Sequence, residues 1–386
     1  MVAKQKNMTS RRLLFLVTED WYFLSYRLDL ARSARNAGYE VVVATRVGGH
    51  GDQIASEGFR LEALDWKRGS LNPFELVRSL FAILRLYRRV RPDIAHHVSL
   101  KPIVLGSIVA LLMPNLPVVN SLTGFGHTFT ATTLWARVLA RAVSITLVPL
   151  LRRRATITIV ENEDDRRFLV ETLHVPVEQT ANLGAGVDLR RFTPMPLPNR
   201  TPVTIGCVAR MLVIKGVGDL AAASRLLGAR GVPHHLILAG GTDPENPGSI
   251  AEATIQDWVQ QGIECPGQVA DPRDVWRRVD IAVQPSLGGE GLPRSLVEAA
   301  ACGRPLVVTD VPGCRDVARA DVNGFIVPPA APAALADALE RLVRDQALRE
   351  RFAAESRRIV EATFSLDQVL AATLALYDRL LRRPSP

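Results

Sequence analysis

The chain has 386 residues, 47% of them apolar, with 27 glycines and 25 prolines, which suits two globular domains and excludes a disordered or fibrous protein. Its cysteines, Cys207, Cys265, Cys302 and Cys314, lie far apart, which argues against a zinc site and a secreted disulfide framework and favours a reducing cytoplasm. Residues 1–195 hold 26 Lys and Arg against 17 Asp and Glu (+9), whereas residues 196–386 hold 21 against 22 (−1), so the first half suits anionic lipid headgroups, pyrophosphates or nucleic acid.

Two stretches raise the question of a membrane segment. Residues 1–12 are polar and basic but lead only into the short apolar run Leu13–Val17, so we expect no signal peptide. Residues 102–136 carry no formal charge, and a spanning helix needs about 20 apolar residues. Because Pro114, Pro117 and Asn120 interrupt this run, we expect buried strands and helices here and no membrane span.

The first elements predict a parallel sheet wound by helices. Arg12–Thr18 is expected to be a strand, residues 19–22 a loop, Phe23–Asn36 an amphipathic helix, and Glu40–Thr45 the second strand. This β-α-β order is typical of a doubly wound α/β domain.

Two later segments combine apolar and basic residues. Between Pro73 and Arg91 the apolar residues recur at helical spacing, and arginines occupy much of the remaining surface. Residues 134–154 are apolar on most sides, with arginines at the edges. Each helix could lie in a membrane interface with its cations in the headgroup layer, or pack on the core with a solvated outer face. Both interpretations stay open.

Polar residues follow the next two strands. Ile94–Pro102 has the composition of a strand that ends in polar residues, and it contains His96 and His97; no third ligand is suggested nearby, so we expect no metal site. The strand Val118–Asn120 is followed by the loop Thr123–His127, at the edge where parallel sheets bind ligands. His127 is therefore either a substrate contact or a histidine packed in a glycine-rich loop.

The first domain is expected to end at a proline-rich linker. After a strand at Ile157–Val160, the acids Glu163–Asp165 open a helix whose first turn they suit, and we expect them to be solvated. Thr193–Pro202 contains four prolines and little to bury. We place the domains at residues 1–193 and 202–364, with a final helix over 365–386.

The second domain opens with two cations that predict a diphosphate site. Arg210 and Lys215 follow the strand Val203–Val208 and precede a helix. A helix N-terminus and two cations favour phosphate groups. An exposed pair of cations without a ligand is the alternative.

Two carboxylates stand in the stretch Pro285–Pro305. A strand at Val279–Val283 is followed by a glycine turn and a helix, Arg294–Cys302, that stops at Gly303. Glu290 and Glu298 are eight positions apart, so they would share one face if the helix extended back into the turn. Carboxylates facing a crevice can accept hydrogen bonds from sugar hydroxyls, whereas the alternative is a solvated helix face.

Several of these segments resemble one family. Glu290–Gly303 resembles the signature of the retaining, GT-B-fold glycosyltransferase family 4, and Arg210–Gly216 its Arg-x4-Lys-Gly motif. Asp20–Arg27 and His96–Pro102 resemble the subgroup that extends undecaprenyl-diphosphate-linked sugars, with Tyr26 where that pattern has His.

The resemblance implies a fold and a set of roles. It implies two Rossmann-like domains with a cleft between them, and a last helix that crosses back to the acceptor-binding first domain. Arg210 and Lys215 would bind the nucleotide diphosphate, Glu290 the donor sugar and Glu298 the ribose. The remaining implied substrate contacts are Asp20, Thr123, Gly124, His127, Gly291, Leu292 and Pro293. The family usually has Tyr at the position of His127.

The expected activity is retaining, metal-independent sugar transfer without a cofactor. The substrates would be a UDP-sugar, carrying an N-acetylhexosamine or a hexose, and a polyprenyl-diphosphate-linked saccharide of bacterial surface polysaccharide synthesis. We assign no general base and expect no nucleic-acid partner. The protein would be cytoplasmic and peripheral on the anionic inner face of the cell membrane. The alternatives are a GT-B-like sugar-nucleotide epimerase or phosphorylase, and a non-enzymatic binder of polyanions or membrane surfaces.

Overall fold

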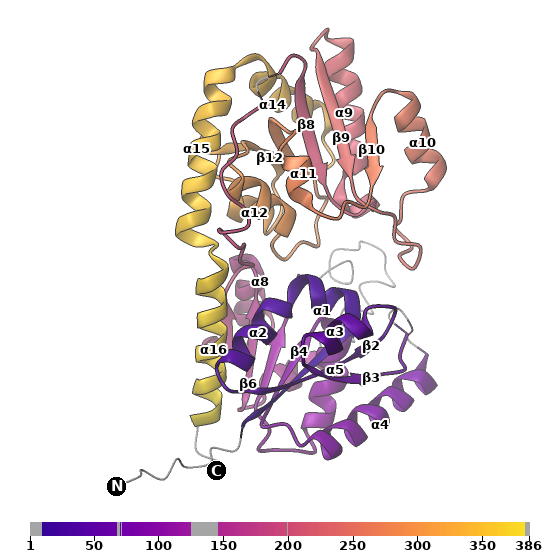
Figure 1. Ribbon diagram of the computed structural model, residues 1–386, viewed down its shortest axis with the longest axis vertical. Helices are drawn as coiled ribbons and strands as arrows, with labels where there is room; N and C mark the ends of the chain where they lie inside the picture. Colours follow the sequence, from indigo (N-terminus) through magenta and orange to yellow (C-terminus); the bar gives the residue numbers. More distant parts are fainter. Residues whose placement is uncertain (1–9, 68–69, 71, 125–145, 199, 383–386) are drawn as a thin grey trace.

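The computed structural model describes residues 10–67, 70, 72–124, 146–198 and 200–382. It has two layered α/β domains with a long helical segment along one side of both (Figure 1). Both sheets are parallel, which confirms the predicted α/β fold class with two Rossmann-like domains.

Within the described ranges, seven parallel strands form the first sheet, in the order β3-β2-β1-β4-β5-β6-β7. Their bounds are β1 Arg12–Glu19, β2 Glu40–Arg46, β3 Arg60–Ala63, β4 Ile94–Val98, β5 Val118–Ser121, β6 Thr156–Val160 and β7 Thr180–Asn182. The helices around it are α1 Asp20–Tyr26, α2 Leu28–Asn36, α3 Gly51–Ser56, α4 Pro73–Val90, α5 Leu100–Ala110 and α8 Glu163–Arg167, which continues as a π-helix over Phe168–Thr172. A 3-10 turn, Val177–Gln179, precedes β7.

The middle strand β1 shows why this sheet is buried on both faces. Alternate side chains of a strand point to opposite faces. Leu13, Phe15 and Val17 pack in the core with residues of α2 and of the last helix, whereas Leu14 and Leu16 pack with residues of α4 and α5. A continuous apolar run is the composition expected of a parallel strand covered on both sides.

The second sheet has six parallel strands among the described residues, in the order β10-β9-β8-β11-β12-β13. They are β8 Val203–Val208, β9 His234–Ala239, β10 Glu264–Gly267, β11 Ile281–Gln284, β12 Leu306–Thr309 and β13 Gly324–Val327. The helices are α9 Val217–Ala229, α10 Glu252–Gln260, α11 Pro272–Trp276, α12 Arg294–Ala301, α13 Cys314–Val317, α14 Pro332–Arg344 and α15 Gln346–Thr363, with a 3-10 turn at Val213–Lys215. In each sheet the winding reverses at the middle pair, β1/β4 or β8/β11, and such switch points are where open parallel sheets bind ligands.

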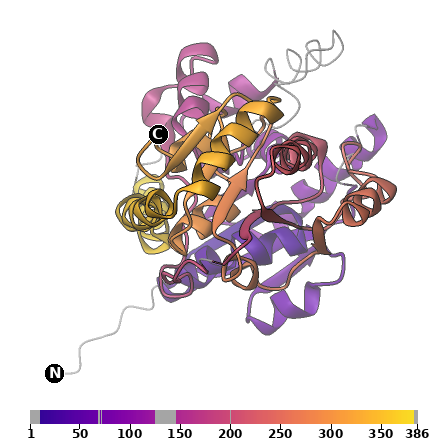
Figure 2. The ribbon, with the colours of Figure 1, turned by 90° about the horizontal axis from the view of Figure 1, so that it is seen from above.

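The chain passes between the domains twice at one place. Val187 donates its N–H to Phe364 O at 2.9 Å, and Leu366 N donates to Val187 O at 3.0 Å. The last helix, α16 Leu366–Arg382, then packs against α2 of the first domain, and Figure 2 shows α15 and α16 nearly end-on. Meanwhile the linker is held on the second domain, because the buried Arg304 guanidinium donates to the carbonyls of Met195 and Pro196.

Two local expectations differ from the structure. The helix expected over Phe23–Asn36 is divided at Arg27, whose backbone leaves the helical region (φ −128°). Residues 20–22, expected in a loop, are the first turn of α1. The helix therefore starts directly at the end of β1 and carries Asp20 into the interior.

The two histidines of β4 have structural partners. His96 bonds through Nδ1 to Tyr377 Oη at 2.5 Å and through Nε2 to Ser121 Oγ at 2.7 Å. His97 Nε2 lies 2.6 Å from Tyr87 Oη. Burial lowers the pKa of His97 to about 3 and that of His96 well below its usual value. Both rings are therefore neutral and held by hydroxyl groups.

No helix in the described part of the chain is both long enough and apolar enough to cross a membrane. Of the second mixed apolar and basic segment, residues 146–151 are helical, and residues 134–145 lie outside the described ranges.

Candidate functional site

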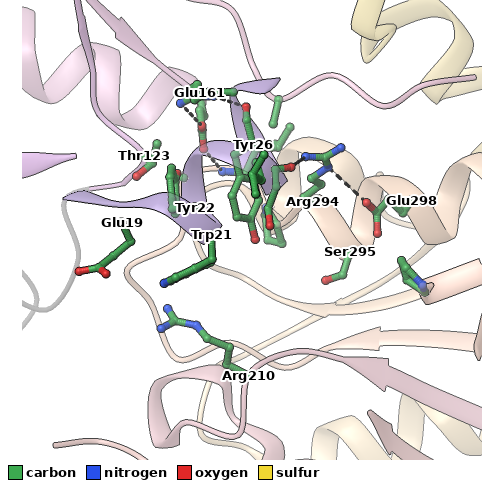
Figure 3. Close-up of a pocket in the computed structure, with 18 of the residues that line it drawn as sticks. Glu19, Trp21, Tyr22, Tyr26, Thr123, Glu161, Arg210, Arg294, Ser295 and Glu298 are labelled. Carbon is green, nitrogen blue, oxygen red and sulfur yellow. Dashed lines mark hydrogen bonds and ion pairs between the residues drawn. The ribbon is translucent and has the colours of Figure 1, made fainter. Parts of the chain in front are cut away.

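A cavity of about 1150 Å³ lies between the two domains and is lined by both (Figure 3). Its walls include residues that follow β1, β5 and β6 in the first sheet and β8, β9 and β11 in the second. It brings together most of the sequence-predicted site residues: Asp20, Thr123, Arg210, Lys215, Glu290, Gly291, Leu292, Pro293 and Glu298. His127 lies outside the described residues.

Lys215 and Glu290 form an ion pair inside the cavity. The Lys215 ammonium lies 2.7 Å from both carboxylate oxygens of Glu290. Ser286 Oγ donates to the same carboxylate and is itself held by Gln284 Nε2 at 2.8 Å. Glu290 is only 7% exposed, and the charges of Lys215 and Glu290 compensate each other.

Arg210 lies at the edge of the same cavity, and its side chain is more exposed than that of Lys215. Its Nη1 donates to Asp243 Oδ2 at 2.7 Å, and its side chain remains 43% exposed. An exposed ion pair contributes little free energy, roughly 0–1 kcal/mol. The guanidinium can therefore exchange Asp243 for a phosphate at small cost.

Glu290 and Glu298 do not share a helical face, so this expectation is wrong. Helix α12 begins at Arg294, and Pro293 before it is extended (ψ 106°). Gly288 and Gly289 in the preceding turn have φ of 146° and 70°, values that glycine adopts readily and a helix does not contain. The turn therefore presents Glu290, and the helix presents Glu298.

Glu298 is linked through Arg294 to the first domain. Arg294 Nε lies 3.2 Å from Glu298 Oε1, its Nη1 donates to Ser25 O, and its guanidinium carbon lies 5.5 Å from the centre of the Tyr26 ring. Burial raises the pKa of Glu298 to about 7, which the nearby arginines only partly offset. Figure 3 shows Arg294 between Tyr26 and Glu298.

Asp20 holds a loop of its own domain. Its buried carboxylate accepts hydrogen bonds from the backbone N–H groups of Gly48, Gly49 and His50 at 2.7, 3.1 and 2.8 Å. Burial opposes ionisation, but these hydrogen bonds outweigh it and keep the pKa of Asp20 below its usual value. The observed role of Asp20 is to shape the cavity wall, and a direct contact with substrate stays a prediction.

Gly124 and Gly291 bring the backbones of the two domains together. A Cβ on Gly124 would lie 2.7 Å from Gly291 N, and one on Gly291 would lie 2.9 Å from Thr123 C. Real Cβ atoms do not approach other atoms so closely. These two glycines, predicted as substrate contacts, therefore permit the close approach of the domains behind Glu290.

Sequence reasoning missed two residues directly after β6. Glu161 lines the cavity, and Asn162 is buried beside it. The helix start at Glu163–Asp165 is also not fully solvated as expected, because Asp165 is buried and caps with Asn162: its N–H donates to Asn162 Oδ1 at 2.7 Å. The rule used for the loop after β5, that ligands bind at the carboxyl edge, applies equally to the residues that follow β6.

No group of three or more His, Cys, Asp and Glu side chains within the described ranges is arranged to hold a metal ion. The cationic side chains that line the cavity are those of Arg27, Arg46, Arg191, Arg210, Lys215 and Arg294.

Models of protein families match both halves of the chain. A glycosyl transferase 4-like model matches residues 12–159, and a model described as glycosyl transferases group 1 matches residues 202–345. The two matches coincide with the two parallel sheets.

The whole chain also resembles individual proteins. It is 24% identical over 374 residues to N,N'-diacetylbacillosaminyl-diphospho-undecaprenol alpha-1,3-N-acetylgalactosaminyltransferase of Campylobacter jejuni, covering 92% of this chain and 96% of the relative. Sucrose-phosphate synthase from Thermosynechococcus elongatus superposes with a TM-score of 0.79 at 19% identity, covering 97% of this chain and all of that one. Anabaena HepE in complex with UDP gives a TM-score of 0.76 at 17% identity, covering 95% and 100%. The solved structures thus share the fold of this chain.

Proposed function

We propose a specific reaction for this chain, from the premise that it belongs to the glycosyltransferases of GT-B type. It transfers a sugar, an N-acetylhexosamine or a hexose, from a UDP-sugar to a polyprenyl-diphosphate-linked saccharide, with retention of anomeric configuration. The full-length similarity to an undecaprenol-linked transferase supports the acceptor class, and the similarity in fold to a protein that binds UDP supports the donor class.

The observation that carries this proposal is the pairing of charges at the carboxyl edge of the second sheet. Lys215 and Glu290 are joined, with Arg210 at the rim of the same cavity and Glu298 within it. When the donor binds, Lys215 and Arg210 take the diphosphate, and the carboxylate of Glu290 becomes free to accept hydrogen bonds from sugar hydroxyls. Glu298 accepts from the ribose.

The cations act mainly on the leaving group. Negative charge grows on the diphosphate as the bond from the sugar breaks, and preorganised cations stabilise that charge more in the transition state than in the ground state. These side chains supply positive charge that a divalent metal could otherwise provide. We assign no carboxylate nucleophile: a departing phosphate oxygen can take the proton of the acceptor hydroxyl.

The first domain offers a surface for the membrane that carries such an acceptor. On α4, three apolar side chains are exposed, Phe74 by 86%, Val77 by 51% and Phe81 by 58%. Arg85 and Arg88 lie exposed further along this helix. Aromatic and basic residues on one helical face favour the headgroup layer of an anionic bilayer. We therefore propose a cytoplasmic protein that is peripheral on the inner face of the membrane.

The test is release of UDP by the purified protein with a panel of UDP-sugars, with and without a short-chain undecaprenyl-diphosphate-sugar analogue. Release that depends on the acceptor, and a product with retained configuration, would support the proposal. Glu290→Gln keeps the size of the side chain and should abolish transfer while UDP still binds. Conversion of a UDP-sugar without acceptor would favour an epimerase, and unchanged transfer by Glu290→Gln would overturn the assignment of the site.

A further inference from the structure

The peptide group between Gly291 and Leu292 is held on both of its polar atoms by the other domain. Asn162 Nδ2 donates to Gly291 O at 2.8 Å, and Leu292 N donates to Glu161 Oε2 at 3.2 Å. Glu161 and Asn162 are consecutive and directly follow β6 of the first sheet. We call this pair of hydrogen bonds the peptide clamp.

The two domains approach too closely at the clamp to admit a side chain on Gly291. A Cβ on Gly291 would lie 2.3 Å from Glu161 Oε2, so a side chain there would displace the carboxylate. The backbone of Gly124 closes the same contact from the neighbouring loop, because its own Cβ would lie 2.9 Å from Glu290 C. The clamp therefore holds the peptide one residue after Glu290 against the first domain.

We propose that Glu161 and Asn162 are positioning residues that set the donor-sugar carboxylate of Glu290 against the acceptor-binding domain. The clamp can form only when the domains are together, because its members come from different domains. This inference rests on the proposed function, in which the first domain carries the acceptor. It assigns the first domain a part in aligning the donor sugar, in addition to binding the acceptor.

The electrostatic surroundings of Glu161 make the clamp sensitive to pH. Burial raises the pKa of Glu161 to about 7; Arg27, 3.8 Å away, and the N–H of Leu292 favour its ionised form, whereas Asp165 and Glu290 oppose it. The phenol of Tyr22 also faces this carboxylate. Separation of the domains would admit water to Glu161 and would thereby lower its pKa toward the ordinary value. Ionisation above about pH 7 therefore opposes closure, and lower pH favours it.

The test compares variants that keep or remove each hydrogen bond. Glu161→Gln keeps an acceptor oxygen and removes the charge, whereas Glu161→Ala removes both. Asn162→Ser keeps a capping oxygen for α8 but is too short to reach Gly291 O. As matched control, Arg315→Gln removes another ion pair between the domains, from Arg315 to Asp164 at 2.8 Å, without touching the clamp.

We expect loss of the clamp to lower the rate of transfer without changing the affinity for the nucleotide. Glu161→Ala and Asn162→Ser should lower kcat about tenfold, the effect of one lost hydrogen bond, with the Kd for UDP unchanged and the thermal midpoint near that of Arg315→Gln. Glu161→Gln should keep kcat near that of the parent protein, and should lose the dependence of closure on pH between 6 and 8 that we expect of the parent protein. Equal kcat in all variants, or an equal loss in Arg315→Gln, would overturn the inference.

A second measurement separates this inference from the proposed reaction. The radius of gyration in saturating UDP, measured by small-angle X-ray scattering, needs no transfer. Glu161→Ala and Asn162→Ser should be more extended than the parent protein and Arg315→Gln. If the parent protein shows no transfer with any pair of donor and acceptor, the proposed function fails, and the scattering result alone supports or overturns the clamp. Equal radii in that case would overturn it.

Discussion

The buried ion pair between Lys215 and Glu290 makes each of these side chains depend on the other. Replacing Lys215 by Met leaves the Glu290 carboxylate buried with Ser286 as its remaining hydrogen-bond partner. We expect this variant to lose roughly 3–5 kcal/mol of unfolding free energy, because an uncompensated buried charge is costly. Urea unfolding measures the loss.

The double variant Lys215→Met/Glu290→Gln is the control for this prediction. It removes both charges, so it should recover a large part of the stability lost in the single variant. A double variant that is as unstable as the sum of the two singles would contradict the assigned pairing.

The pKa of Glu298 predicts how donor binding changes with pH. Burial raises this pKa to about 7, and in the proposed role the ionised carboxylate accepts hydrogen bonds from the ribose hydroxyls more strongly than the protonated acid does. As the pH falls from 8 to 6, Glu298 becomes protonated, and the Kd for the UDP-sugar should rise roughly tenfold. Calorimetric titration at several pH values checks this.

Glu298→Gln is the matched variant, because an amide has no charge to lose over this range. Its affinity should be lower at pH 8 and should not vary with pH. The same slope in Glu298→Gln as in the parent protein would assign the titration to another group.

The sequence predicted which residue types meet in the cavity better than how each is presented. Arg210, Lys215, Glu290 and Glu298 were identified from strand ends and motif spacing, and the cavity brings them together. Lys215 and Glu290 are 75 positions apart in the sequence, so no local pattern predicts their ion pair. Their roles in binding and transfer stay predictions.

At the scale of the elements, the packing of α16 against the first domain depends on Tyr377. This side chain is fully buried, its hydroxyl lies 2.5 Å from His96 Nδ1, and its ring packs edge-on against Tyr39 at 6.1 Å between centres. Tyr377→Phe should cost about 1–3 kcal/mol of unfolding free energy, because a buried nitrogen of His96 loses its partner. Tyr377→Ala should cost roughly 3–5 kcal/mol, through the cavity it leaves.

Thermal unfolding followed by calorimetry measures both variants. Thr373 lies on the same helix, also buried, but its hydroxyl bonds only within α16, to Val369 O. Thr373→Val therefore serves as the control and should have a small effect. If Tyr377→Ala were as stable as Thr373→Val, α16 would not contribute to the first domain as described.

Helix boundaries show where local patterns fail. The periodicity of residues 23–36 predicted one helix, but the chain turns at Arg27, and the spacing alone did not show this. The glycines and Pro293 before α12 were visible in the sequence, and the helix start at Arg294 agrees with the composition. The shared face of Glu290 and Glu298 failed because it required the helix to pass through that glycine turn.

At the scale of the whole molecule, the exposed arginines of α4 predict binding to anionic bilayers. Arg85→Glu/Arg88→Glu should weaken binding to vesicles containing anionic lipid at least about tenfold, since each cation near such a surface contributes about 1 kcal/mol. Co-sedimentation with anionic and with neutral vesicles measures the effect. Phe74→Ser/Phe81→Ser should weaken binding further, by removing the inserted apolar groups.

The control reverses two exposed arginines of the second domain, Arg225→Glu/Arg351→Glu, and makes the same change in net charge. It should leave binding to anionic vesicles nearly unchanged. Equal loss in both double variants would indicate attraction by total charge and would contradict a specific role of α4.

The two parallel sheets were predictable because alternating strands and helices with a proline-rich linker leave few other arrangements. The domain limits 1–193 and 202–364 stay a prediction. The close contact of Gly124 with Gly291, by contrast, depends on how two independently folded surfaces meet, and a single sequence carries no pattern for such a contact.

The position of α16 also affects the order in which the two domains can fold during translation. Tyr377 and Leu380 belong to the core built on β1 and β2, yet they lie in α16, which is synthesised after every strand of the second sheet. The first sheet emerges early, but its core can be completed only when α16 has left the exit tunnel. The second domain, whose strands end at Val327, can finish before it, which reverses the usual order in which amino-terminal domains fold first during translation.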